Sequence, residues 1–320
     1  MRHTVRLIVL LGACLALGAC GSSDEDRGGV ADASGGLRVA AAFYPLEEIA
    51  RAVGGARASV TGLTPPGSGP HDLELRASQV VALERADVIV FLGAGFQPAV
   101  EKLVAQRRGD DVIAIDLFDE VTLRRVDPAV PGVRGDVDGE VLDGDRDPHV
   151  WVDPARFAEL VDTVNRTFAT ADPDGAATYA RNAAAYRAKV LALDAQFDRA
   201  LNACRTQTLV TSHAAFGYLA DRYGLAQAPI AGITPDDEPD PKSLAATARK
   251  AKADGVKTVF FETLVPRKLA DTVAREIGAR SDALDPVEGL TRQQLDAGES
   301  YLTIQRENLR RLSKGLRCTA

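Results

Sequence analysis

Short apolar runs alternate with segments of helical periodicity along most of the chain. Residues 88–92 contain no polar side chain, which is typical of a parallel strand buried on both faces. The pattern predicts strands at 38–43, 58–61, 87–92 and 112–115, and helices at 45–53, 78–86 and 96–106. It then restarts, with strands at 208–211, 226–231, 258–262 and 283–284 and helices at 214–223, 242–254, 266–278 and 299–314. We therefore expect two α/β lobes, each with a parallel sheet covered by helices.

A long helical pattern connects the two lobes. It begins at Asp172-Pro173, a helix-capping residue followed by a first-turn proline. Apolar side chains then recur every three or four positions on one stripe, at Tyr179, Ala183, Tyr186, Val190, Leu193, Phe197 and Leu201. Such a helix would have about 30 residues and a length of roughly 45 Å. We expect a rigid connection without large hinge closure, between an N-terminal lobe at 37–171 and a C-terminal lobe at 206–320, with the helix within 172–205.

The first residues have the features of an export signal. Arg2 and Arg6 form a short cationic region, which is followed by an apolar segment at 7–17 and by the letters LGAC that end at Cys20. This ending resembles the lipobox of bacterial lipoproteins, in which the cysteine is lipidated and becomes the new N-terminus. The resemblance implies a signal peptide at 1–19 and a lipid on Cys20. The polar, glycine-rich segment that follows, 20–36, is expected to be a flexible tether.

Composition and charge narrow the class of protein. The 320 residues are 46% hydrophobic and 26% charged, as in ordinary globular proteins. The net charge of −7 disfavours nucleic acid as a partner, because phosphate binding requires a basic surface. Once the signal peptide is removed, Cys204 and Cys318 are the remaining thiols beside Cys20. In an oxidising compartment we expect them to form a disulfide, although two unpaired structural cysteines remain an alternative.

An acidic, glycine-rich segment occupies residues 127–148. Asp143, Asp145 and Asp147 match the first three ligand positions of a calcium-binding loop, but Pro148 and Pro154 stand where that loop needs glycine and glutamate. The calcium interpretation therefore fails. A solvated loop is favoured, and a minor role of residues 134–147 in collecting cations stays open.

Three histidines remain after the signal peptide, and each is expected in a loop beside a strand end or a helix start. They are His71, His149 and His213. One loop histidine is usually just solvated or hydrogen-bonded, but ligands collect at the carboxyl ends of parallel strands, so two facing lobes would bring all three to one cleft. Neutral imidazoles suit Zn²⁺, and a closed tetrahedral site needs a fourth donor. Asp285, after the short strand 283–284, is the expected fourth ligand, and Glu262 is a second candidate for lining the site.

The order of these residues resembles a known family, the cluster A-I metal-binding lipoproteins of ABC importers, which bind zinc or manganese. The resemblance rests on four motifs, namely PHDLE at 70–74, DPHVW at 147–151, SHAAFGY at 212–218 and LDP at 284–286. It implies an extracytoplasmic protein, anchored to the membrane by Cys20, that captures a metal ion and delivers it to a membrane permease. In this family a histidine at the position of His213 implies zinc, and glutamate there implies manganese. The family's Asp-Pro-Leu-Gly motif is one residue longer here, at 285–289.

Other functions remain as alternatives. A manganese importer or an adhesion-type lipoprotein could have the same fold. A zinc hydrolase would need an open coordination position and a general base, yet the chain has no His-Glu-x-x-His motif and four protein ligands would fill the site. A large stacking pocket for an organic ligand is disfavoured by the single tryptophan. We therefore expect a monomeric binding protein rather than an enzyme.

Overall fold

The computed structural model describes residues 36–71, 73–107, 111–126, 146–236 and 239–319. The expected signal peptide, Cys20, almost all of the tether and most of the acidic segment lie outside these residues. The described residues all belong to one compact unit. No helix among the described residues has the length and apolar character needed to cross a membrane.

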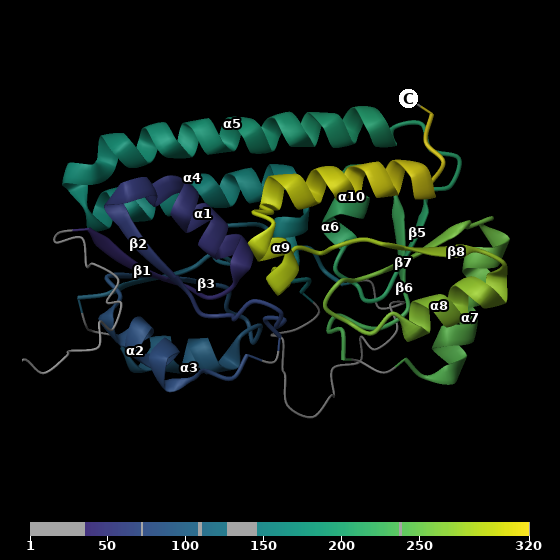
Figure 1. Ribbon diagram of the computed structural model, residues 1–320, viewed down its shortest axis with the longest axis horizontal. Coiled ribbons are helices and arrows are strands. Elements are labelled where there is room, and N and C mark those ends of the chain that lie inside the picture. Colours follow the sequence, from purple (N-terminus) through teal and green to yellow (C-terminus); the bar gives the residue numbers. More distant parts are fainter. Residues whose placement is uncertain (1–35, 72, 108–110, 127–145, 237–238, 320) are drawn as a thin grey trace, which may run out of the picture. The chain divides into compact units, whose positions relative to one another are not determined.

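The N-terminal lobe contains a four-stranded parallel sheet within the described residues, in the order β2-β1-β3-β4. Its strands are β1 (Leu37–Ala41), β2 (Ala58–Gly62), β3 (Val88–Phe91) and β4 (Ile113–Asp116). Helices α2 (Ala77–Arg85) and α3 (Pro98–Gln106) lie on one side of this sheet, and α1 (Tyr44–Gly54) and α4 (Pro154–Ala171) lie on the other (Figure 1). All four residues of β3 are buried, because helices cover both faces of the sheet.

The C-terminal lobe repeats this arrangement with the strand order β6-β5-β7-β8. Its strands are β5 (Thr208–Thr211), β6 (Ala226–Pro229), β7 (Thr258–Phe261) and β8 (Arg280–Ala283). The helices of this lobe are α6 (Gly217–Arg222), α7 (Pro241–Ala253), α8 (Lys268–Ile277), α9 (Arg292–Asp296) and α10 (Tyr301–Gly315). The predicted fold class, two parallel-sheet lobes joined by a long helix, is confirmed.

The connecting helix α5 (Ala176–Leu201) follows a short turn, Pro173–Gly175, that is capped by Asp172. All seven residues of the predicted apolar stripe are buried. The helix packs against α1 and α4 of the first lobe and against α10 of the second (Figure 1). Residues from both lobes, such as Phe43 and Phe216, belong to one hydrophobic cluster. The lobes therefore share a core as well as a connecting helix.

The sequence-based prediction of elements was incomplete, and it missed the short helix α9 (Arg292–Asp296). The segment after Asp153-Pro154 forms α4, an 18-residue helix that the pattern did not predict beyond its cap. The last strand, expected at 283–284, is β8 (Arg280–Ala283), and it carries mostly polar residues. β8 lies at the edge of the sheet and is partly exposed, and its first three residues are polar, so it lacks the apolar run that marks a buried strand.

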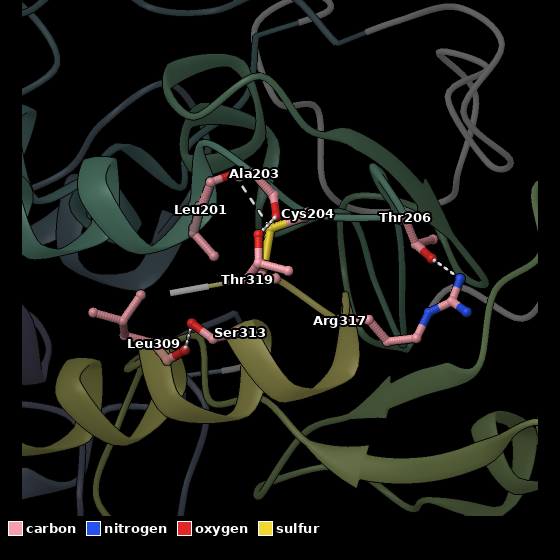
Figure 2. Close-up of a disulfide and its surroundings, with 9 residues drawn as sticks. Leu201, Ala203, Cys204, Thr206, Leu309, Ser313, Arg317 and Thr319 are labelled. Carbon is pink, nitrogen blue, oxygen red and sulfur yellow. Dashed lines mark hydrogen bonds between the residues drawn. A yellow bond between two sulfur atoms is a disulfide. The ribbon is translucent and has the colours of Figure 1, made fainter.

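The predicted disulfide between Cys204 and Cys318 is present (Figure 2). It joins the chain just after α5 to the chain just after α10, which are 114 residues apart in sequence. Beside it, the Thr319 amide donates to the Ala203 carbonyl at 3.0 Å, and the Arg317 guanidinium donates to the Thr206 hydroxyl at 2.8 Å (Figure 2). The C-terminal segment is therefore held against the end of the connecting helix.

Candidate metal centre

His71 lies in the long loop between β2 and α2. Its side chain is buried, and its ring packs edge-on against Phe96 with 4.9 Å between the ring centroids. Gly67 in the same loop has a φ of +86°, which favours glycine, and its amide donates to the Leu290 carbonyl at 2.7 Å. This bond ties the loop of His71 to the segment that follows Glu288.

His149 comes just before the short helical turn Val150–Val152 that leads into α4. Asp147 orients its ring, because one carboxylate oxygen, Oδ1, lies 2.9 Å from His149 Nδ1 and also accepts the His149 amide at 3.0 Å. Asp147 is itself buried, with its Oδ2 3.5 Å from Arg124 Nη1. The Nε2 atom of His149 is thereby directed away from Asp147.

His213 lies two residues after β5, at the carboxyl end of the second sheet. Glu262 follows the neighbouring strand β7 and contacts both the ring and the backbone of His213. Its Oε2 lies 2.7 Å from His213 Nδ1, and its Oε1 accepts the His213 amide at 3.0 Å. Glu262, which was expected to line the site, therefore contacts Nδ1 of His213, whereas Nε2 of the same ring faces Glu288.

The three imidazoles meet at Glu288. The Oε1 atom of Glu288 lies 3.5 Å from His71 Nε2, 3.4 Å from His149 Nε2 and 3.2 Å from His213 Nε2. The four donor atoms lie within 4.8 Å of one another, and no member is more than 4% exposed. Each lobe contributes two of these residues, so the site lies between the lobes.

Asp285 is not part of this group, contrary to the sequence-based expectation. Its carboxylate binds the Val287 amide at 2.8 Å, the Thr263 hydroxyl at 2.9 Å and the Gln294 side chain at 2.8 Å. Glu288, three residues further on, takes the expected place. The signal was present in the sequence, because the 285–289 motif has one extra residue and Glu288 lies within it.

The turn that brings Glu288 to the histidines contains a strained residue. Val287 has a φ of +60°, a left-handed conformation that costs a residue with a Cβ about 1–2 kcal/mol. Gly289 is needed for close approach, because a Cβ there would lie 2.8 Å from the Ser68 carbonyl oxygen. The Glu288 turn and the His71 loop are thus in direct contact.

Side chains of α10 and the first lobe hold the ligand-bearing segments together. Trp151 Nε1 donates to the Pro286 carbonyl at 2.8 Å, and Gln305 Nε2 donates to the Val152 carbonyl at 3.2 Å. The side-chain amide of Asn308 makes two bonds to the backbone of Asp285. Its Oδ1 accepts the Asp285 N–H at 3.0 Å, and its Nδ2 donates to the Asp285 carbonyl at 2.6 Å. The His149 segment and the Glu288 turn are therefore both fixed against α10.

The buried carboxylates and imidazoles of the site change each other's affinity for protons. Burial favours the neutral form of His213, but the carboxylates of Glu262 and Glu288 outweigh it and raise the pKa of His213 to about 10. Burial likewise opposes charge on His149, yet the hydrogen bonds that its ring makes to the Asp147 and Glu288 carboxylates raise its pKa. Burial lowers the pKa of His71. Burial acts to raise the pKa of Glu288, but the interactions with His213, His71 and His149 outweigh it and hold that pKa well below its usual range. The carboxylate thus stays charged and ready to bind a metal ion.

Comparison with known proteins identifies the family of the chain. A family model, periplasmic zinc-uptake complex component A (ZnuA), matches residues 39–315. The high-affinity zinc uptake system protein ZnuA of Bacillus subtilis is 33% identical over 314 residues, which cover 97% of both chains. The zinc-binding lipoprotein AdcA of Streptococcus pneumoniae is 32% identical over 320 residues, which cover 97% of this chain and 60% of AdcA. The chain thus spans about 60% of the length of the AdcA relatives.

A solved structure has the same fold. The Zn(II)-bound ZnuA-like domain of Streptococcus pneumoniae AdcA is 33% identical and has a TM-score of 0.73, covering 88% of this chain and 99% of that domain. The family model covers well over half of the chain, and the relatives align along nearly all of it. This chain therefore belongs to the periplasmic zinc-uptake complex component A (ZnuA) family.

Proposed function

We propose that this chain captures Zn²⁺ outside the cytoplasm and delivers it to the membrane permease of an ABC importer. The observation that carries the proposal is the convergence of His71, His149, His213 and Glu288, whose donor atoms lie within 4.8 Å of one another. Zinc in proteins is bound by four such donors, and they replace its hydration shell. The captured ion is the protein's cargo, and these four residues would be its ligands.

The donor set favours zinc over manganese. Three imidazoles and one carboxylate form a nitrogen-rich site, whereas Mn²⁺ prefers oxygen donors. Asp147 and Glu262 each contact an Nδ1 atom, which leaves the Nε2 atoms of His149 and His213 to bind the ion. The names of the relatives from Bacillus subtilis and Streptococcus pneumoniae, both described as zinc proteins, support the same choice.

Capture is favoured over catalysis. Four protein donors would complete the preferred coordination of zinc and leave no position for a reacting water. Delivery to a permease is supported by the family, a component of a zinc-uptake complex. Anchoring through a lipid on Cys20 is supported by the LGAC motif and by the lipoprotein name of the AdcA relative. We propose that the protein acts as a monomer at the outer surface of the membrane.

Elemental analysis of the purified protein tests the metal and the site together. After zinc loading and removal of excess metal, the wild type should hold one zinc ion per chain. H213A and E288A should hold far less, and E299A, which removes an exposed carboxylate, should behave as the wild type. A wild type without zinc, or Mn²⁺ that displaces Zn²⁺ at neutral pH, would show that the proposal is wrong.

Delivery of zinc to the permease and anchoring through Cys20 are tested in cells. A host that lacks this chain should take up little radioactive zinc at low external concentration, and the wild type but not H149A should restore uptake. C20A should move the protein from the membrane fraction to the soluble fraction without changing its zinc content. Normal uptake in the H149A strain would separate this chain from zinc import.

A further inference from the structure

Asp285 is a buried carboxylate that the metal site does not use directly. Both of its oxygens are occupied, since Oδ1 accepts the Val287 amide and Oδ2 accepts the side chains of Thr263 and Gln294. The backbone of Asp285 is fixed as well, because the side-chain amide of Asn308 binds both the N–H and the carbonyl of Asp285. Together these bonds of Asp285 define the conformation of the turn that begins at this residue.

The conformation of that turn is one that the chain would not adopt freely. Val287 has a φ of +60°, and β-branched residues strongly disfavour the left-handed region. The next residue is Glu288, whose Oε1 lies 3.2 to 3.5 Å from three imidazole nitrogens. If Val287 relaxed to a negative φ, the direction of the chain at Glu288 would change and the carboxylate would leave the histidines. The bond from the Val287 amide to Asp285 Oδ1 directly opposes this relaxation.

We propose that Asp285 is a positioning residue for zinc capture, which holds Val287 in its left-handed conformation so that Glu288 reaches the metal. The inference rests on the proposed function and deepens it. Glu288 binds the ion, and Asp285 holds Glu288 in the orientation that binding requires. The essential property of residue 285 is a side-chain acceptor for the Val287 amide. Asparagine also provides one and forms the same kind of turn.

The test compares substitutions of similar shape that differ in this acceptor. D285N keeps an acceptor oxygen, whereas D285L is close in shape and has none. We expect D285L to weaken zinc binding by about 10- to 100-fold, the usual effect of losing a residue that orients a metal ligand. D285N should stay close to the wild type. Zinc affinity is measured by competition with a chromophoric chelator, and folding by circular dichroism and thermal melting.

A second substitution tests the role of Val287. Glycine adopts a positive φ without steric cost, so V287G should bind zinc nearly as well as the wild type. In the double variant D285L/V287G the turn no longer needs the carboxylate, and much of the lost affinity should return. The visible absorption of bound Co²⁺, which reports its coordination, should change in D285L and recover in the double variant. A purely structural role of Asp285 would not produce this recovery.

The outcomes separate this inference from the proposed function. If the wild type binds zinc, E288A does not, and D285L binds as tightly as the wild type, then the inference about Asp285 is wrong and the function stands. Equal losses in D285L, D285N and the double variant would also contradict the inference. A wild type that fails to bind zinc would contradict the function itself. If D285L does not fold, D285A replaces it in the same comparisons, with and without V287G.

Discussion

Trp151 and Pro286 join the two lobes at the metal site, because the indole Nε1 of Trp151 donates to the Pro286 carbonyl at 2.8 Å. Trp151 follows His149 by two residues, and Pro286 precedes Glu288 by two. One buried hydrogen bond therefore connects a ligand segment of the first lobe to a ligand segment of the second.

Removing that hydrogen bond should weaken both the fold and the site. W151F keeps an aromatic ring but leaves the buried Pro286 carbonyl without its donor, which costs about 1–3 kcal/mol. We expect urea denaturation to show this loss of stability and chelator competition to show weaker zinc binding. The control is F168L, which changes a buried aromatic residue that packs against Tyr179 of α5 and should leave zinc affinity unchanged. Unaltered zinc affinity in W151F would show that the bond serves the fold alone.

Gly217 at the start of α6 should be required for the orientation of His149. A Cβ at this position would lie 2.6 Å from Asp147 Oδ2 and 2.8 Å from Arg124 Nη1. G217A should therefore displace Asp147 from His149, lower stability by about 1–3 kcal/mol and weaken zinc binding. Isothermal titration calorimetry measures the affinity.

The matched control for G217A is G69A. Gly69 has no atom within 4 Å of its notional Cβ and no positive φ. It also lies near a ligand, His71, so it controls for mutation beside the site. Wild-type behaviour is expected for G69A, and equal effects of the two substitutions would argue against the steric explanation.

The disulfide should stabilise the fold without contributing to zinc binding. It closes a segment of 114 residues, so its loss should cost about 2–5 kcal/mol of unfolding free energy. We expect C204S/C318S to unfold at lower urea concentration and to retain one zinc per chain. The wild type treated with a phosphine reductant should match the double variant in both respects. If the reduced wild type loses its zinc, the disulfide has a role in the site as well.

Zinc binding should release protons and should weaken as the pH falls. Burial opposes the charge on His213, but Glu262 and Glu288 raise its pKa to about 10, so the metal-free protein holds this proton at pH 7. A raised pKa means that the proton is bound below that value and must leave when zinc takes Nε2, and acid therefore competes with the metal. Calorimetry in buffers of different ionisation enthalpy measures the protons released. A binding enthalpy independent of the buffer would contradict this expectation.

Much of the fold could be predicted from local patterns. The apolar runs of the buried strands and the stripe from Tyr179 to Leu201 each carry a periodicity that the structure reproduces. Most of the edge strand β8 could not be found in this way, because its first three residues, Arg280, Ser281 and Asp282, are polar. The histidines were recognisable because loops at the carboxyl ends of parallel strands collect ligands, a rule that depends only on the order of elements.

The sequence by itself determined the two lobes, the long helix and three of the four residues in the cluster. Only the tertiary structure decided which acidic residue joins the histidines, because that choice depends on the backbone of one turn. Asp285 turns its carboxylate back to the Val287 amide, and the left-handed Val287 carries Glu288 forward to the imidazoles. Local patterns describe which residues are near a site, but the direction of a side chain follows from dihedral angles that distant contacts, such as those of Asn308, impose.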